Sequence, residues 1–224
     1  MTSPIGVIQQ VALGDQVADA LRRLIISGEL TAGTRLVEIP LAEQFGVSRG
    51  PIREAFVRLE SEGLLTTGRR GAFVVGMTDE DIDELYSLRE TIELFAVSLI
   101  ISRRDTLDWS RLETAVAQMH EAAEAGDHQA FSRIDIGFHS AIYELAGHRR
   151  LLDVWRSYEK TFEVVLDQSG RRGLDLFDAA TDHTALLERL QHAPEAECHE
   201  VVRNHLANAH RRLIGRFGSR HSAK

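Results

Sequence analysis

The chain has 224 residues, of which 43% are hydrophobic and 27% are charged, and its formal net charge is −8. This is the composition of an ordinary globular protein of one or two domains, which excludes a disordered or low-complexity chain. No apolar run approaches the roughly 20 residues of a membrane span, and the first residues carry no signal-peptide pattern. The single cysteine, Cys198, excludes an intrachain disulfide, so we expect a cytoplasmic protein.

The charge is unevenly distributed along the chain. Residues 1–77 contain eight basic and eight acidic residues, so this part is neutral. The rest contains 18 basic and 26 acidic residues and accounts for the whole net charge. A neutral N-terminal part can still bind nucleic-acid phosphates through a local group of arginines, although less tightly and less indiscriminately than a strongly basic domain.

The N-terminal part is predicted to contain three helices. Residues 15–27 have apolar residues at helical spacing, and residues 35–37 form a short extended piece that could pair with a later strand. Residues 39–45 and 48–62 are expected to be two further helices. Gly46 separates them, since glycine tolerates the left-handed geometry of a tight helix exit.

The third of these helices has a defined start. Ser48 is its N-cap candidate, whose hydroxyl could satisfy a free backbone N–H, and Pro51 lies in its first turn, where the missing donor costs little. Ile52, Phe56 and Leu59 form an apolar stripe on this helix, and Arg49 and Arg53 lie one turn apart on a neighbouring face. Two β-rich runs follow over residues 64–75, joined by a Gly-Arg-Arg-Gly turn.

The order of helix, glycine turn, helix and two-stranded wing predicts a winged helix-turn-helix. The second helix of that motif enters the major groove of DNA, and arginine pairs with guanine through two hydrogen bonds. The pattern alone leaves an alternative open, in which this part is a small helix-hairpin module with solvated arginines.

This block resembles the N-terminal DNA-binding domain of the GntR family of bacterial transcription regulators. The residues that carry the resemblance are Leu41-Ala42-Glu43, Gly46-Val47-Ser48-Arg49, Pro51-Ile52-Arg53-Glu54-Ala55, Leu59, Glu62-Gly63-Leu64 and Arg70-Gly71. The resemblance implies a DNA-binding domain over residues 1–76. The DNA contacts that we expect are Ser48, Arg49, Gly50, Pro51, Arg53, Arg69, Arg70 and Gly71.

The remaining residues, 77–224, are expected to be entirely helical. Thr78 is an N-cap candidate, and the acidic residues after it favour the start of a helix. The predicted helices cover residues 79–103, 110–125, 127–146, 150–168, 174–191 and 194–217. Short joints containing Gly or Pro separate them, so we expect an antiparallel bundle. The predicted fold is therefore mainly α, with an N-terminal winged helix-turn-helix and a C-terminal six-helix bundle.

A possible metal site lies in this second half. Asp135 and His139 are one helical turn apart, so a carboxylate and an imidazole could share a divalent cation. Five of the ten histidines have an acidic residue four positions earlier, so this spacing alone is weak evidence. Yet both residues, and also His183 and His205, lie on apolar helix faces, where a carboxylate must be paired or ligated. The pattern leaves open a hydrogen-bonded polar core without metal.

The second half resembles the FCD domain, the effector-binding bundle of the FadR subfamily of GntR regulators. The residues that carry this resemblance are Thr78, Asp81, Leu85, Leu88, Arg89, Ile92, Glu93, Asp135, Phe138, His139, Ile142, Ala146, Gly147, Leu151, Leu152, Asp182, His183, His205 and Leu206. Metal-binding members use an Asp-x-x-x-His pair and two later histidines at these places. The resemblance therefore implies an effector-binding and dimerisation domain over residues 77–224, with a divalent metal on Asp135, His139, His183 and His205. Three imidazoles suit zinc or nickel, with manganese as a further candidate.

Arg89 is a candidate for effector binding. It lies between the apolar residues Leu88 and Ile92 on the first bundle helix and is expected to face partly inward. In similar proteins an arginine at this place faces the effector cavity, where it could clamp a carboxylate. A salt bridge to Glu93, one turn later, is an equally open alternative.

The sequence predicts a ligand-responsive bacterial transcription regulator, expected to be a repressor. As a homodimer it would bind a palindromic operator in double-stranded DNA, and a small organic acid would bind at the metal site. One rival is a metal-dependent hydrolase or lyase, but no further acid or base stands out near the Asp135 and His139 pair, so we expect no enzyme. Another rival is a constitutive DNA-binding protein with an inert bundle.

Overall fold

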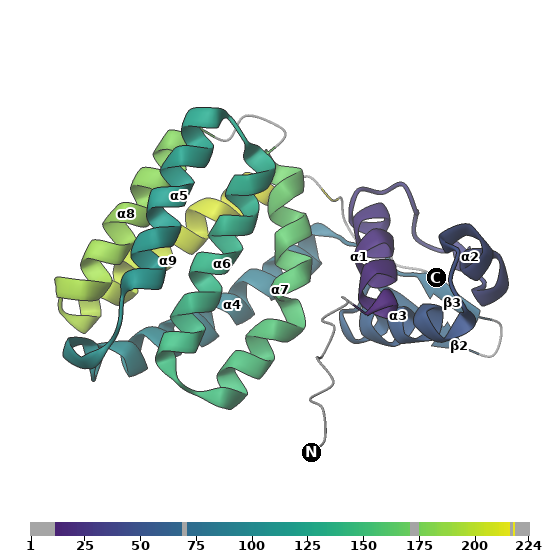
Figure 1. The fold of residues 1–224 in the computed structure, drawn as a ribbon, viewed down its shortest axis with the longest axis horizontal. Coiled ribbons are helices and arrows are strands. Elements are labelled where there is room, and N and C mark those ends of the chain that lie inside the picture. The colour runs from purple at the N-terminus through teal and green to yellow at the C-terminus, as the bar shows by residue number, and fades with distance from the viewer. Residues whose placement is uncertain (1–11, 69–70, 171–174, 216, 218–224) are drawn as a thin grey trace, which may run out of the picture. The chain divides into compact units, whose positions relative to one another are not determined.

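The computed structural model describes residues 12–68, 71–170, 175–215 and 217. Among these residues it contains nine α-helices, one short 3₁₀ helix and three β-strands (Figure 1). The chain divides into two compact units, Met1–Gly76 and Met77–Lys224. The mainly helical fold class predicted from the sequence is confirmed. None of the described helices is long and apolar enough to span a membrane.

The first unit combines three helices with a small sheet. Its elements are α1 (Leu13–Ile26), β1 (Arg35–Leu36), α2 (Glu38–Phe45), α3 (Arg49–Ser61), β2 (Leu65–Gly68) and β3 (Gly71–Val74). The strands form an antiparallel sheet in the order β1-β3-β2, with Leu36 opposite Ala72 and Thr66 opposite Phe73. The extended piece after α1 therefore pairs with the wing, as the sequence predicted.

A glycine turn joins α2 to α3. Gly46 has a φ of 65°, which is the predicted left-handed conformation. Ser48 occupies the N-cap position of α3, but its side chain accepts no hydrogen bond from a backbone N–H of the helix, so the predicted capping bond is wrong. Ile52, Phe56 and Leu59 form the buried stripe of α3. Burial of this stripe directs the opposite side of the helix to solvent.

The second unit is the predicted six-helix bundle. Its elements are α4 (Asp79–Ile101), the 3₁₀ helix η1 (Arg104–Thr106), α5 (Ser110–Ala125), α6 (His128–Ala146), α7 (Arg149–Gly170), α8 (Leu176–His192) and α9 (Glu195–Leu213). Helix α6 lies in the middle of the bundle, where it packs against α4, α5 and α7, and α9 packs against α4 and α8 (Figure 1). Side chains of α6, α8 and α9 can therefore meet inside the bundle.

Local chemistry sets several of the helix ends. The Thr78 hydroxyl accepts from the Asp81 backbone N–H at 3.2 Å, and the Asp81 carboxylate accepts from the Thr78 N–H at 2.8 Å. This reciprocal pair is a capping box at the start of α4. Gly126 and Gly147 follow α5 and α6 in the left-handed conformation, so both helices end where the sequence predicted.

The last helix is shorter than predicted. We expected it to continue to residue 217, but α9 ends at Leu213 and Gly215 has a φ of 82°. The backbone N–H groups of Gly215 and Phe217 donate to Asp79 Oδ1 at 3.0 and 3.2 Å. These two bonds tie the segment that follows α9 to the first turn of α4.

The buried side of α4 is not its most apolar side. The apolar residues Leu88 and Ile92 are only partly buried, and Phe95 is 49% exposed. The residues that α4 buries are Ile82, Tyr86, Arg89, Glu93, Ala96, Val97 and Ile100. The helix thus directs an arginine and a glutamate into the bundle, further inward than the sequence indicated.

Candidate functional site

The N-terminal end of α3 presents two arginines to solvent. Arg49 begins the helix, Arg53 lies one turn later, and their side chains are 54% and 59% exposed. Both donate to the carboxylate of Glu38 at the start of α2. Arg49 donates from Nη2 at 2.6 Å and from Nε at 3.0 Å, and Arg53 donates from Nε at 2.9 and 3.0 Å. Hydrogen bonds from Arg53 and then Arg49 lower the pKa of Glu38.

Three other predicted DNA contacts lie at the same end of α3. Ser48 and Gly50 are exposed, and Pro51 is partly exposed. Residues 46–50 also match the Gly-x-Ser-x-Gly spacing of hydrolase nucleophiles. In those enzymes the serine follows a strand, whereas Ser48 follows α2. The helix-turn-helix therefore accounts for this spacing.

The wing contributes the remaining predicted contacts. Gly71 begins β3 with a φ of 111°, and a Cβ atom added there would lie 3.0 Å from the carbonyl oxygen of Leu36. Only glycine suits this position, because both the backbone conformation and the contact with β1 exclude a side chain. Arg69 and Arg70 lie outside the described residues.

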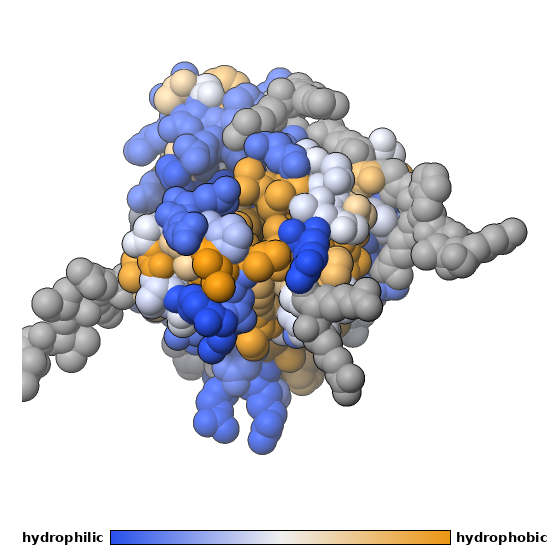
Figure 2. Space-filling model, turned by 90° about the vertical axis from the view of Figure 1, so that its right-hand side faces the viewer, coloured by the Kyte–Doolittle hydropathy of each residue, from blue (hydrophilic) through white to orange (hydrophobic). Residues whose placement is uncertain are grey.

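Sequence reasoning missed one residue on this face. Val57 continues the line of Arg49 and Arg53 by one more helical turn and is 66% exposed. Figure 2 shows apolar side chains reaching the surface between hydrophilic ones. The large exposed apolar residues described in the first unit are Leu13, Val37, Ile39, Val57 and Val75. An apolar side chain in this line is suited to contact with the methyl group of thymine. The spacing of four residues was the signal that could have identified Val57.

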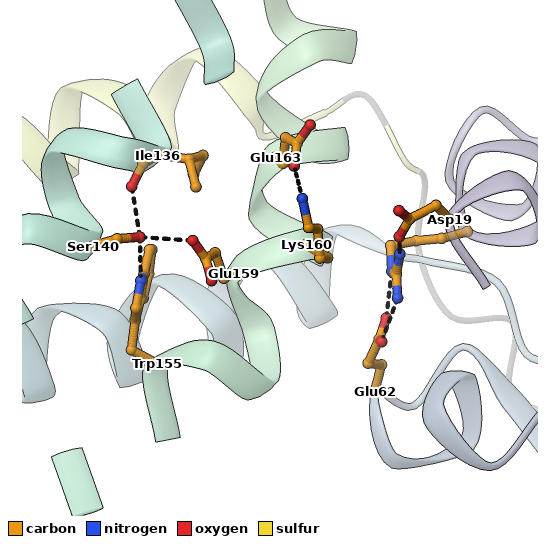
Figure 3. A network of polar contacts seen from close by, with 9 residues as sticks. Asp19, Glu62, Ile136, Ser140, Trp155, Glu159, Lys160 and Glu163 are labelled. Carbon is orange, nitrogen blue, oxygen red and sulfur yellow. Dashed lines mark hydrogen bonds and ion pairs between the residues drawn. The ribbon is translucent and has the colours of Figure 1, made fainter. Parts of the chain in front are cut away.

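A buried ion pair holds α1 against the far end of α3. Arg22 is 3% exposed and donates from Nε and Nη2 to the Glu62 carboxylate at 2.6 Å each, while Nη1 contacts Asp19 (Figure 3). A buried pair of this kind is costly to break on one side. It therefore fixes the helix that carries the two exposed arginines.

Four polar residues gather inside the second unit. Asp135 and His139 come from α6, His183 from α8 and His205 from α9. One potential ligand atom of each lies within 4.8 Å of the others. The first three residues are buried and His205 is partly buried. The structure brings together all four residues that the sequence singled out, and we call them the Asp/His cluster.

Hydrogen bonds determine which ring nitrogens face the centre of the Asp/His cluster. His183 Nδ1 lies 2.7 Å from the carbonyl oxygen of Ala179, and His139 Nδ1 lies 2.7 Å from Glu93 Oε1. These oxygens accept, so in the neutral rings both Nδ1 atoms carry the proton and both Nε2 atoms keep a free lone pair. His139 Nε2 lies 3.3 Å from His205 Nε2. The Nε2 atoms are therefore the ones available to a ligand.

An unsatisfied ring nitrogen of the cluster fits a metal ion. His183 Nε2 is buried without a hydrogen-bond partner among the described residues, although Asp135 Oδ1 lies 2.9 Å away. Two ligand atoms that share one ion lie close in this way without a hydrogen bond. Ligand atoms about 2.0–2.2 Å from an ion lie at most about 4.4 Å apart, so a small contraction would bring all four onto one centre. Three imidazoles and one carboxylate suit zinc or nickel, and manganese less well.

Burial sets the protonation of the cluster. It lowers the pKa of His139, and the nearby charge of Arg89 lowers it further. Burial, together with the neighbouring His183 and His139, also lowers the pKa of His205 well below its ordinary value. Burial would raise the pKa of Asp135, but the neighbouring His183 outweighs it and the pKa is lowered. Neutral His139 and His205 and an ionised Asp135 are the forms that bind metal.

A small cavity lies beside the cluster. Its walls include Arg89, Ser132, Asp135, His183, His205 and Arg212. The space open to the centres of water-sized molecules is about 30 Å³, which is enough for about two waters. A larger hollow of about 420 Å³ lies between α5 and α6, with Arg111 and Arg133 in its walls, but it includes none of the cluster residues.

Arg89 stands at the cavity wall with one unused donor. Its Nε donates to Glu93 Oε2 at 3.2 Å, and its guanidinium lies 5.4 and 5.1 Å from the ring centroids of Trp155 and Phe162. Its Nη2 is buried and has no hydrogen-bond partner in the described part of the chain. The structure thus contains the predicted salt bridge and also leaves a donor for a ligand, so the two alternatives for Arg89 are compatible.

Comparison with known families decides the classification. Residues 13–75 match the model of the gntR family of bacterial regulatory proteins, and residues 84–208, more than half of the chain, match the FCD domain. The chain belongs to the GntR family of bacterial transcription regulators and carries an FCD domain.

Several relatives of this GntR regulator are named. The gluconate operon transcriptional repressor of Bacillus licheniformis is 34% identical over 171 residues, which cover 75% of this chain and 69% of the relative. The gluconate operon repressor of Bacillus subtilis is 30% identical over 181 residues, or 81% and 74% of the two chains. The structure of Escherichia coli McbR/YncC matches with a TM-score of 0.72 at 25% identity, covering 93% of this chain and 100% of that one. The family and these relatives are transcription regulators, not enzymes.

Proposed function

We propose that this GntR regulator is a homodimeric, ligand-responsive repressor that binds a palindromic operator and senses a small carboxylate at a metal ion in its FCD domain. The observation that carries this proposal is the Asp/His cluster, which lies beside a buried arginine with a free donor. The same chain carries a helix-turn-helix whose arginines are exposed. The chain therefore combines a candidate effector sensor, the Asp/His cluster, with a candidate DNA-binding helix, α3, which we call the reader.

The reader half of the proposal rests on α3. Arg49 and Arg53 lie on one exposed side of this helix, as required of a helix that enters the major groove. In this role they contact bases and phosphates, Ser48 contacts a phosphate, and Gly50 and Pro51 allow a close approach. The wing residues Arg69, Arg70 and Gly71 contact the adjacent backbone or minor groove.

A dimer is the usual arrangement in which a helix-turn-helix protein reads a palindrome. One helix of 13 residues spans about one half-site, and two copies related by a twofold axis read a palindrome. Helix α4 offers a surface for pairing, because Leu88, Ile92, Phe95 and Leu99 lie on a side that the monomer leaves partly or fully exposed.

The sensing half of the proposal rests on the cluster and its cavity. Asp135 and the Nε2 atoms of His139, His183 and His205 would hold zinc, nickel or manganese, and the bound ion supplies a positive charge with open positions for a carboxylate. The free Nη2 of Arg89 supplies a donor for the same ligand. Two relatives are named repressors of a gluconate operon, and gluconate is a sugar acid with one carboxylate.

The response requires two states of the dimer with different effector affinity. An acid that binds better to one state shifts the dimer to that state and changes the separation of the two α3 helices. Because coupling is reciprocal, DNA that prefers one state changes the effector affinity by the same factor.

The proposal is tested with metal-loaded protein and DNA from its own promoter region. Binding at moderate salt should be specific, and a thermal-shift screen of small organic acids should identify one that raises stability and alters DNA affinity. His139→Ala should lose both the metal and the response to that acid while it still binds the DNA. Full acid binding by this variant would refute the metal-bridged sensor, and absence of specific DNA binding by the wild type would refute the reader.

A further inference from the structure

We infer that Glu93 is a positioning residue that links the metal ligand His139 to the ligand-binding arginine Arg89. This inference rests on the proposed function, because it concerns the same metal and effector site. Glu93 lies on α4, is fully buried and belongs to neither the metal ligands nor the cavity walls that the structure identifies. One of its carboxylate oxygens nevertheless contacts His139, and the other contacts Arg89.

The contacts of Glu93 are divided between its oxygens. Oε1 lies 2.7 Å from His139 Nδ1. Oε2 accepts from Arg89 Nε at 3.2 Å and from the Tyr143 hydroxyl at 3.3 Å. All four side chains are buried, so water does not compete for these bonds and the carboxylate has one geometry.

The first consequence concerns the imidazole of His139. A carboxylate that accepts from Nδ1 holds the proton there, which leaves the Nε2 lone pair directed at the centre of the Asp/His cluster. Without Glu93, the ring could carry its proton on Nε2, which lies 3.3 Å from His205 Nε2. That tautomer cannot bind the ion, so loss of Glu93 should weaken metal binding even though no ligand is removed.

The second consequence concerns the guanidinium of Arg89. Glu93 occupies Nε only, while Trp155 and Phe162 lie near the guanidinium at 5.4 and 5.1 Å. These contacts restrict the group and leave Nη2 without a partner in the described residues. One carboxylate thus fixes both the ligand that holds the ion and the donor that meets the effector, which are the two anchors of a single carboxylate ligand.

A purely structural ion pair would have different consequences. It would stabilise the bundle through Arg89 and Glu93. It would not require Glu93 Oε1 to face Nδ1 of His139, the ring nitrogen that points away from the centre of the Asp/His cluster. The two roles differ in their effect on metal affinity and on the His139 tautomer. Both quantities can be measured without the effector.

The test compares Glu93→Gln with Glu159→Gln. Glu159 on α7 is a matched control, because its carboxylate accepts from Ser140 at 2.8 Å in the same unit and it is not one of the cluster residues (Figure 3). Zinc alone is the probe, and its affinity is measured by competition with a chromogenic chelator. Glu93→Gln should bind zinc about 10–100-fold more weakly than wild type, and Glu159→Gln should match the wild type. Equal affinity of Glu93→Gln and wild type would overturn the inference.

A second measurement covers the case in which Glu93→Gln does not fold. Nitrogen-15 NMR of the metal-free wild type should show His139 with its proton on Nδ1, and a proton on Nε2 would overturn the inference. The failure of the proposed function looks different, because the wild type itself would then bind no zinc at the cluster.

Discussion

Glu38 at the surface and Glu93 in the bundle each bind more than one partner side chain through both of their carboxylate oxygens. Glu38 accepts from Arg49 and Arg53, and all three side chains are exposed or partly exposed. Glu93 serves Arg89 and His139, and these side chains are 0–1% exposed. Burial alone would raise the pKa of Glu93, but the interactions with His139 and Arg89 outweigh it and lower the pKa to about 2.

The difference in burial determines whether the partners of each carboxylate can be exchanged. In water an ion pair contributes little, because solvent screens it and competes for it, so DNA phosphates can replace Glu38 as partners of the two arginines. In the bundle no solvent replaces a lost partner, so the groups around Glu93 keep one arrangement. An exchangeable pair suits a reader, and a fixed pair suits a preorganised ligand site.

The largest expected effect is on stability in the bundle. Arg89→Met should lower the free energy of unfolding by about 3–5 kcal/mol, because the buried Glu93 loses its cationic partner. The measurement is urea unfolding of metal-free protein, followed by the fluorescence of the buried Trp155. Arg53→Met, the exposed counterpart, should change stability by less than about 0.5 kcal/mol. Similarly small losses of unfolding free energy in Arg89→Met and Arg53→Met would contradict the distinction between the buried and the exposed ion pair.

The next effect comes from the metal. Zinc at about a hundredfold excess over its dissociation constant should stabilise the protein by about 2.7 kcal/mol. His139→Ala should lose this gain in stability. DNA binding by the metal-free wild type should persist, because Arg49 and Arg53 do not depend on the metal ion. A thermal-shift titration with zinc and then with a chelator measures the gain, and an equal gain in His139→Ala would place the metal elsewhere.

DNA affinity should respond directly to the two exposed arginines of α3. Arg49→Ala or Arg53→Ala should weaken binding to promoter DNA by about 1–3 kcal/mol, or roughly 5–150-fold, because each loses a bidentate contact. The free protein should remain folded and dimeric. The control is Arg58→Ala, since Arg58 is exposed on α3 but pairs with Asp15 of α1. Unchanged affinity in the first two variants, measured by fluorescence anisotropy, would reject α3 as the reader.

The smallest effect concerns Glu38. Glu38→Gln frees two guanidinium groups at the surface, so non-specific DNA should bind more tightly and with a steeper salt dependence. One additional phosphate contact changes the slope of log K against log salt by about 0.9. Anisotropy titrations on random-sequence DNA over a range of salt measure this slope. A slope equal to that of the wild type would show that Glu38 does not compete with phosphate.

Much of this architecture was predictable because it depends on local signals. Gly46, Gly126 and Gly147 end helices in the left-handed conformation that only glycine adopts easily. The inward residues of α6 and α8 follow from helical spacing, so His139 and His183 were found beside their apolar neighbours.

The carboxylates were harder to predict. Helix α4 has apolar residues on more than one side, so periodicity did not show that Arg89 and Glu93 face the bundle completely. Glu38 meets Arg49 and Arg53 only because the glycine turn folds α2 onto α3. Both contacts depend on tertiary packing rather than on spacing within one helix. The capping bond of Ser48 failed for a similar reason, since a suitable residue type does not determine the direction of its side chain.

The most direct measurement is anomalous X-ray scattering at the zinc edge from crystals grown with one equivalent of zinc. We predict one strong peak in the bundle, about 2.0–2.2 Å from an Asp135 carboxylate oxygen and from the Nε2 atoms of His139, His183 and His205, with Glu93 still bonded to His139 Nδ1. A peak at another site, coordination through His139 Nδ1, or no peak in the bundle would contradict the proposal that this domain senses a carboxylate at a metal ion held by the Asp/His cluster.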